Sequence, residues 1–168
     1  MNAIFQRRSI RKYEDKPVPD EAVRQILRAG MAAPSAGNAQ EWEFILCRDK
    51  EKMAKIMEMH EYAFALKTAP LAVLVCGNAQ REVYPGEDWW VQDCAAATQN
   101  MLVEAADLGI GSLWLGIHPI EKRIRMMREI FRLPEHIHPF SLVALGYASK
   151  EKEPIDRYEP GWVHEEQF

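Results

Sequence analysis

Hydrophobic and polar residues follow two different periods along this chain, and each period predicts one type of element. Apolar residues spaced by three or four positions predict helices at residues 19–34, 49–60, 88–109 and 120–134. Residues that stop helices stand at three of the expected ends, namely Pro34, Gly109 and Pro134. Short apolar runs predict strands at residues 42–47, 70–78, 112–116 and 140–146.

The order of these elements indicates the fold class. The run at 70–78 is apolar almost throughout, which is typical of a strand covered on both faces. Helices and strands alternate loosely along the chain, as they do in layered α/β or α+β domains built on one sheet. We expect residues 1–146 to form this single domain.

The last part of the chain, residues 147–168, follows neither period. It is polar, contains two prolines and carries three late aromatic residues, Tyr158, Trp162 and Phe168. Aromatic side chains outside any periodic element need another surface to lie on. A second subunit could provide that surface.

Composition limits the class of protein. Hydrophobic residues make up 48% and charged residues 27% of the chain, which excludes a disordered protein. No apolar run reaches the roughly 18 residues that a membrane span needs, and the first residues do not resemble a signal peptide. A net charge of −4 argues against a general nucleic-acid binder. Three scattered cysteines without a C-x-x-C pair indicate a reducing compartment, so we expect a cytoplasmic protein.

The sequence contains only weak signals for a metal site or for catalysis by side chains. His136 and His138, with His118, could ligate a metal, but no acid or cysteine completes such a set. We therefore expect solvated loop histidines and no metal site. The chain also lacks the common phosphate-loop, nucleophile-elbow and zinc-protease motifs.

A basic cluster near the start of the chain suggests an anion. In an extended segment Arg7, Ser9 and Arg11 would point to one side, and Arg8 and Lys12 to the other. Two guanidinium groups and a hydroxyl on one side suit a phosphate, which accepts bidentate hydrogen bonds. A solvated N-terminal segment fits the composition equally well.

Two further stretches are rich in small residues. The stretch "APSAGNAQEWEF" at 33–44 offers exposed backbone amides and the amide side chain of Gln40, which suits a flat ligand with polar edges. Glycines at positions 109, 111 and 116 bracket the third strand, and glycine allows a ligand to approach the backbone closely. Each stretch taken alone is also an ordinary connection between elements.

Together with "RRSIRKY", "GIGSLWLGI" and "LVALGYASKEKEPIDRY", this loop resembles the FMN-dependent nitroreductase family over essentially the whole chain. The resemblance implies an α+β fold, with a central mixed or antiparallel sheet flanked by helices. It also implies an interleaved homodimer, with residues 147–168 packed as an arm on the partner and two FMN sites lined by both chains.

The resemblance also implies which residues bind FMN. They are Arg7, Arg8, Ser9, Arg11 and Arg157 at the phosphate and ribityl end, Pro34, Ser35, Ala36, Gly37 and Gln40 of the partner chain at the flavin, and the backbone of Leu115 and Gly116 at the isoalloxazine. No catalytic side chain is implied, because the flavin carries the electrons and the protein binds and orients it.

The implied activity is hydride transfer from NADH or NADPH to a nitro compound, a quinone or a related small-molecule acceptor. An FMN-binding carrier or sensor without efficient turnover is an alternative, as is a phosphate- or nucleotide-binding module without flavin. Dehalogenation or flavin cleavage is also open within the family. Glu41 stands where many members have proline, and the segment between Gly77 and Trp89 is short for a substrate lid. Trp89 and Trp90 could form a stacking wall, but core or interface packing is expected for at least one of them.

Overall fold

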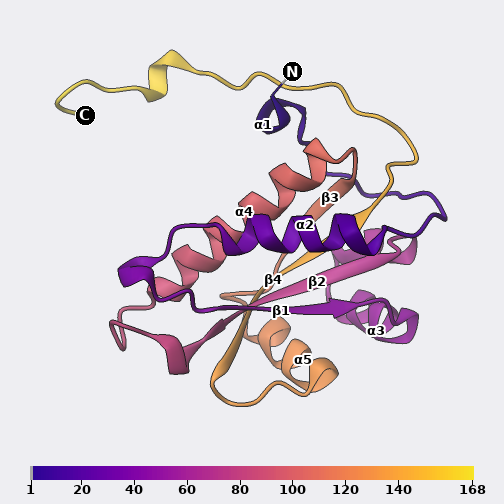
Figure 1. Cartoon of the computed structure of the whole chain (residues 1–168), viewed down its shortest axis with the longest axis horizontal. Coiled ribbons are helices and arrows are strands. Elements are labelled where there is room, and N and C mark those ends of the chain that lie inside the picture. Colours follow the sequence, from indigo (N-terminus) through magenta and orange to yellow (C-terminus); the bar gives the residue numbers. More distant parts are fainter. Residues whose placement is uncertain (1) are drawn as a thin grey trace.

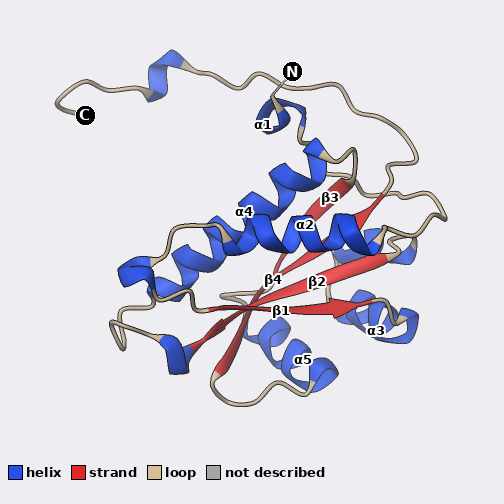
Figure 2. Ribbon diagram, in the orientation of Figure 1, coloured by secondary structure: helices blue, strands red, loops and turns tan. Residues whose placement is uncertain are grey.

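The computed structural model describes residues 2–168 and contains one four-stranded sheet with helices on both faces (Figures 1 and 2). The strands are β1 (Trp42–Cys47), β2 (Leu71–Asn78), β3 (Gly111–Gly116) and β4 (Ile137–Gly146). They are arranged in the order β1-β2-β4-β3, and every neighbouring pair is antiparallel. The predicted α+β class with a sheet flanked by helices is confirmed, and the sheet is antiparallel rather than mixed.

The helices agree closely with the periodic pattern. They are α1 (Ala3–Gln6), α2 (Asp20–Met31), α3 (Lys50–Met59), α4 (Trp89–Asp107) and α5 (Glu121–Phe131). The four longer ones were predicted. At the start of α3 the Asp49 carboxylate accepts hydrogen bonds from the backbone N–H groups of Glu51 and Lys52, so Asp49 is the N-cap of this helix.

Two hydrophobic layers cover the sheet. Successive side chains of a strand point to opposite faces, so Leu74 and Cys76 of β2 join the layer under α3 and α5. Val73 and Val75 join the layer under α2 and α4. All eight residues of β2 are buried, which confirms the prediction of a strand covered on both faces.

Strand β4 begins three residues earlier than predicted. Proline has no N–H to donate, and Pro139 is accommodated because the pairing with β2 shifts register at that point. His138 therefore lies within β4 and is half-buried. The prediction of a solvated loop histidine is wrong for His138.

The side chain of Trp90 covers two histidines, His138 and His118. Its side chain is 6% exposed and stacks on the ring of His138, with the ring centroids 5.4 Å apart. His118 meets the same indole edge-on at 4.9 Å, so it is also packed rather than free in solvent. The expected core role for at least one tryptophan of the pair is confirmed. Among residues 2–168, no group of three or more acids, cysteines and histidines is placed to hold a metal ion.

Segments near the two ends of the chain, residues 9–13 and 147–149, meet beside the sheet. Ile10 N donates to Ser112 O of β3 at 2.9 Å, and Ser149 N donates to Lys12 O at 3.1 Å. After this pairing, residues 150–168 run along the outside of the molecule past α1, with every residue exposed (Figure 1). In the part of the chain that the structure describes, no helix has the length and apolar character needed to cross a membrane.

Candidate functional site

Strand β3 lies at the edge of the sheet, and the basic segment lies along its outer side. In an antiparallel pair, successive residues turn their backbone groups alternately toward the partner strand and away from it. Ser112 O points away from β4, because it accepts the hydrogen bond from Ile10 N. The backbone groups of Trp114 and Gly116 have the same parity and also face outward.

The contacts of Gly116 agree with this direction. Its carbonyl oxygen accepts hydrogen bonds from His60 Nε2 at 3.1 Å and from Arg123 Nη1 at 2.9 Å, and neither residue belongs to the sheet. Of the two residues predicted to present backbone here, Gly116 therefore directs its amide outward, while Leu115 pairs inward with Leu142 of β4.

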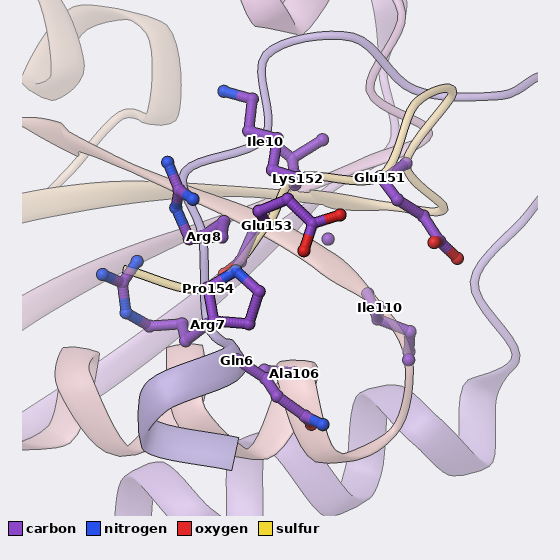
Figure 3. A pocket seen from close by; sticks show the side chains of 14 residues that line it. Gln6, Arg7, Arg8, Ile10, Ala106, Ile110, Glu151, Lys152, Glu153 and Pro154 are labelled. Carbon is purple, nitrogen blue, oxygen red and sulfur yellow. The ribbon is translucent and has the colours of Figure 1, made fainter. Parts of the chain in front are cut away.

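A first cavity lies at the start of β3 and has a volume of about 330 Å³. Arg7 and Arg8 line it together with Ser112, while Lys152 and Pro154 close it from the arm (Figure 3). Figure 3 shows both guanidinium groups on the same side of Pro154. Lys152 Nζ also donates to Ser9 O at 2.8 Å, which ties the arm to the basic segment.

Arg11 lines two more cavities, and the smaller of them includes residues of β3. The larger, of about 480 Å³, is strongly basic, because four lysines share it with Arg11, namely Lys12, Lys67, Lys150 and Lys152. The smaller, of about 250 Å³, contains the predicted Leu115 and Gly116. The structure therefore brings Arg7, Arg8, Ser9, Arg11, Leu115 and Gly116 to one strand edge.

The predicted alternation within the basic segment is wrong. Arg7 and Arg8 line the same cavity, whereas Arg11 lines others. The cause is that only Ser9 forms a bridge to β3, so the segment is not a regular strand. Its buried residues, Ile10 and Tyr13, are three positions apart instead of two.

Four residues of the smallest cavity carried no recognisable sequence signal: His60, Tyr62, Phe64 and Arg123. They follow or begin ordinary amphipathic helices, and only the tertiary fold brings them to β3. Burial, reinforced by the charge of Arg123, lowers the pKa of His60. Tyr62 N donates to His60 Nδ1 at 3.3 Å, so Nε2 carries the proton that it donates to Gly116.

The loop at 34–40 lies elsewhere in the chain, against the start of α4. Ala36 N donates to both carboxylate oxygens of Asp93, at 3.1 and 3.2 Å. Gln40 N donates to Ser35 Oγ at 3.0 Å, and Gln40 Nε2 donates to Asn38 Oδ1 at the same distance. Gly37, Asn38 and Gln40 all have positive φ angles, between 51° and 56°. For the non-glycine residues Asn38 and Gln40 this backbone is strained. Such strain persists only where surrounding contacts fix it, and it occurs often at ligand sites.

Glu41 follows this loop and turns into the core. Its side chain is 2% exposed, and Oε2 has no hydrogen-bond partner among the described residues. Burial, followed by the charges of Asp93 and Glu82, raises its pKa to about 6. Arg157 lies in the exposed arm, away from the core. The 34–40 loop and Arg157 thus differ from the β3 edge, because neither lines any of the three cavities.

Comparisons with known proteins decide the family. The model of the nitroreductase family matches residues 4–61 and 57–147. The chain belongs to the nitroreductase family. The predicted family is therefore confirmed.

Nitroreductase-family proteins similar to this chain are known from several organisms. A protein of Methanothermobacter thermautotrophicus, provisionally named NADH dehydrogenase/NAD(P)H nitroreductase, is 43% identical and covers 100% of this chain and 87% of its own length. The FMN-dependent nitroreductase of Clostridium difficile superposes with a TM-score of 0.90 at 29% identity, covering 99% of both chains. A nitroreductase from Desulfovibrio desulfuricans, solved in complex with FMN, has a TM-score of 0.83 at 32% identity over 99% and 95% of the chains.

Proposed function

We propose that this nitroreductase-family chain binds FMN along the β3 edge and transfers electrons from NADH or NADPH to a nitro compound, a quinone or a related acceptor. The predicted enzyme class, an NAD(P)H-dependent flavin oxidoreductase that uses FMN, is confirmed by the family match and the relatives' names. The observation that carries the residue assignment is one strand edge with a basic segment at one end and the outward amide of Gly116 at the other.

The basic end suits the phosphate and ribityl chain of FMN. Arg7, Arg8 and Arg11 supply guanidinium groups, each able to donate two parallel hydrogen bonds to phosphate oxygens. The half-buried Ser9 lies between them in the chain and adds a hydroxyl. Arg157 is proposed to join this group from the arm, on the basis of the family resemblance.

The other end suits the flavin ring. A Cβ atom added to Gly116 would meet nothing within 4 Å, so a flat ring has room to approach the backbone there. Tyr62 and Phe64 give the same cavity an apolar wall. When bound, FMN accepts hydride from the nicotinamide and passes electrons to the acceptor. The chain binds and orients both molecules, and its outward Gly116 amide is placed to donate a hydrogen bond to the ring.

We further propose that the functional unit is a homodimer. The loop residues Pro34, Ser35, Ala36, Gly37 and Gln40 would reach the partner's flavin, while residues 147–168 would pack on the partner as an arm. The exposure of Tyr158 and Trp162, at 75% and 78%, supports this proposal, because large aromatic side chains are seldom left uncovered.

The test of the proposed function is direct. The purified protein is expected to be yellow and to release one FMN per chain, identified by mass spectrometry. Under nitrogen, NADH or NADPH is expected to bleach the flavin, and a nitro compound or a quinone to restore its colour. Bound FMN that neither nucleotide reduces would favour a carrier or sensor. A colourless protein that does not bind added FMN at micromolar concentration would refute the proposal.

A further inference from the structure

The carbonyl of Gly116 receives an unusual pair of hydrogen bonds at the end of an edge strand. His60 Nε2 and Arg123 Nη1 both donate to it, at 3.1 and 2.9 Å. The two donors come from different elements, because His60 ends α3 and Arg123 lies in the first turns of α5. Gly116 thus joins both helices of one face to the edge of the sheet.

Both donors are themselves held in place. His60 is 2% exposed, and its Nδ1 accepts a hydrogen bond from Tyr62 N, which fixes the ring and its tautomer. Only 14% of the Arg123 side chain is exposed, and its Nη2 lies 3.7 Å from Glu61 Oε1. The Tyr62 ring lies 5.7 Å from the Arg123 guanidinium carbon. The pair is therefore part of a built structure and not a chance surface contact.

A glycine at this position needs such support. Glycine has more backbone freedom than any other residue, so the direction of its N–H is set only if neighbouring groups restrain it. The Gly116 N–H and C=O face the same side of the strand. Two donors on the carbonyl therefore also restrain the amide that faces the cavity.

We propose that His60 and Arg123 are positioning residues, which together clamp the Gly116 carbonyl and aim the Gly116 amide at the flavin ring. This inference rests on the proposed FMN site. Arg123 has a second effect. Reduced FMN carries negative charge on its ring that oxidised FMN lacks, and a guanidinium lining the same cavity favours the reduced form. His60 acts through its hydrogen bond and Arg123 through its hydrogen bond and its charge.

The first experiment measures the reduction potential of FMN bound to Arg123→Met, Arg123→Lys and the wild type. Arg123→Met is expected to lower the ratio of affinities for reduced and oxidised FMN about tenfold. For a two-electron couple this equals a fall of about 30 mV. Arg123→Lys keeps the charge and is expected to recover most of the potential. Arg125→Met removes the same charge from an exposed position of α5 outside the cavity, and is the matched control.

The second experiment isolates the hydrogen bond of His60. His60→Leu removes the donor and is expected to weaken FMN binding roughly fivefold to tenfold, whereas His60→Gln keeps an N–H donor and restores binding. Hydrogen exchange of the Gly116 amide, followed by NMR without FMN, is expected to be faster in His60→Leu than in His60→Gln. Thermal melts show whether each variant is folded.

The outcomes separate this inference from the function on which it rests. A wild type that binds no FMN overturns both. A wild type that binds FMN, with a potential unchanged in Arg123→Met and an affinity unchanged in His60→Leu, overturns the clamp alone. Equal loss in Arg125→Met and Arg123→Met also overturns it, because the effect would then come from net charge. If His60→Leu does not fold, the comparison of the Arg123 variants still decides.

Discussion

The β3 edge and the 34–40 loop are both proposed to contact the flavin, but they are held in different ways. The basic segment beside β3 is anchored by buried Ile10 and Tyr13 and paired with the sheet. The loop holds its shape through hydrogen bonds within itself and from Ala36 N to Asp93 of α4, with Gly37 and Gln40 exposed. One chain therefore builds a well-supported basic edge, whereas the loop and the end of the arm are the parts that we propose to contact a second subunit.

The arm is even more exposed than the 34–40 loop. Residues 150–168 are exposed throughout, and Phe168 is fully so. The same chain that covers all of β2 leaves five large apolar residues of the arm uncovered, namely Ile155, Tyr158, Trp162, Val163 and Phe168. We infer that the arm is stable only on the surface of another copy.

Removing the end of the arm is expected to have the largest effect. Deletion of residues 159–168 removes Trp162 and Phe168 but keeps Arg157. Because the proposed dimer and FMN site stabilise each other, both subunit association and FMN occupancy are expected to fall together. Sedimentation velocity read beside flavin absorbance measures both quantities. A monomer that retains full FMN would refute the shared site.

Arginine substitutions compare the two regions residue by residue. Arg11→Ala tests the β3 edge and Arg157→Ala tests the arm. A charge-assisted hydrogen bond to phosphate contributes roughly 1.5–3 kcal/mol, so each variant is expected to lose about one to two decades of FMN affinity. Arg157 is assigned to the phosphate end, away from the reacting ring, so the FMN that remains bound to Arg157→Ala should be reduced at a near-normal rate.

Fluorescence titration with FMN measures these affinities. Arg24→Ala is the control, because Arg24 is an exposed arginine of α2 that lines none of the three cavities. Unchanged affinity in both Arg11→Ala and Arg157→Ala would show that the phosphate lies elsewhere. A loss in Arg11→Ala alone would restrict the phosphate site to the β3 edge.

Gly116→Ala sharpens the description of the β3 edge itself. The new methyl group would meet nothing within 4 Å in the free protein, so the melting temperature is expected to change little. The methyl would instead occupy space proposed for the flavin, and a loss of about tenfold in FMN affinity is expected. Gly146→Ala should behave in the opposite way.

At Gly146 an added Cβ would lie 2.6 Å from Pro70 Cδ and 2.9 Å from Tyr13 Cδ1. These neighbours are a rigid ring and a buried side chain, so this substitution is expected to lower the melting temperature. Comparing the two variants by thermal melts and FMN titration separates loss of space at the site from loss of stability in the core. Equal destabilisation of both would contradict the open space at Gly116.

The sequence predicted those parts of the molecule that depend on local pattern. The continuous apolar run of β2 and the apolar stripes of the longer helices are such parts, because burial on one or two faces selects them directly. Of the proposed site, the basic segment has a local signal in its own charges, whereas most of the other residues were named by the family resemblance. His60 is instead placed by a contact with Gly116, 56 positions along the chain, and no local period marks it.

Strand β4 shows that a local signal can also mislead the prediction of an element's start. The apolar run predicted a start at residue 140, directly after Pro139, and a proline usually argues against a central strand. The structure keeps Pro139 in β4 because the register shift with β2 removes the need for its N–H. A register shift is a property of two strands together, and the sequence of one strand does not contain it.

Glu41 has the smallest expected effect on FMN binding, and it lies directly after the 34–40 loop. Its pKa is raised to about 6 from 4.5, first by burial and then by the charges of Asp93 and Glu82. Between these two pH values the folded state binds more protons than the unfolded state, so folding stability falls as the pH rises. Above about pH 6 the Glu41 carboxylate is charged in the folded state as well, and the full loss of folding stability has been reached.

Glu41→Gln removes this penalty, because glutamine stays neutral. Its stability relative to the wild type is expected to improve by about 1–2 kcal/mol between pH 4 and pH 7.5. Urea unfolding at several pH values measures the difference and cancels any constant effect of the amide. The neutral side chain also leaves the hydrogen bonds from Ala36 N to Asp93 in place, so the loop should keep its shape and FMN affinity should be unchanged. A difference in stability that does not vary with pH would mean that Glu41 is not confined with those acids as the structure places it.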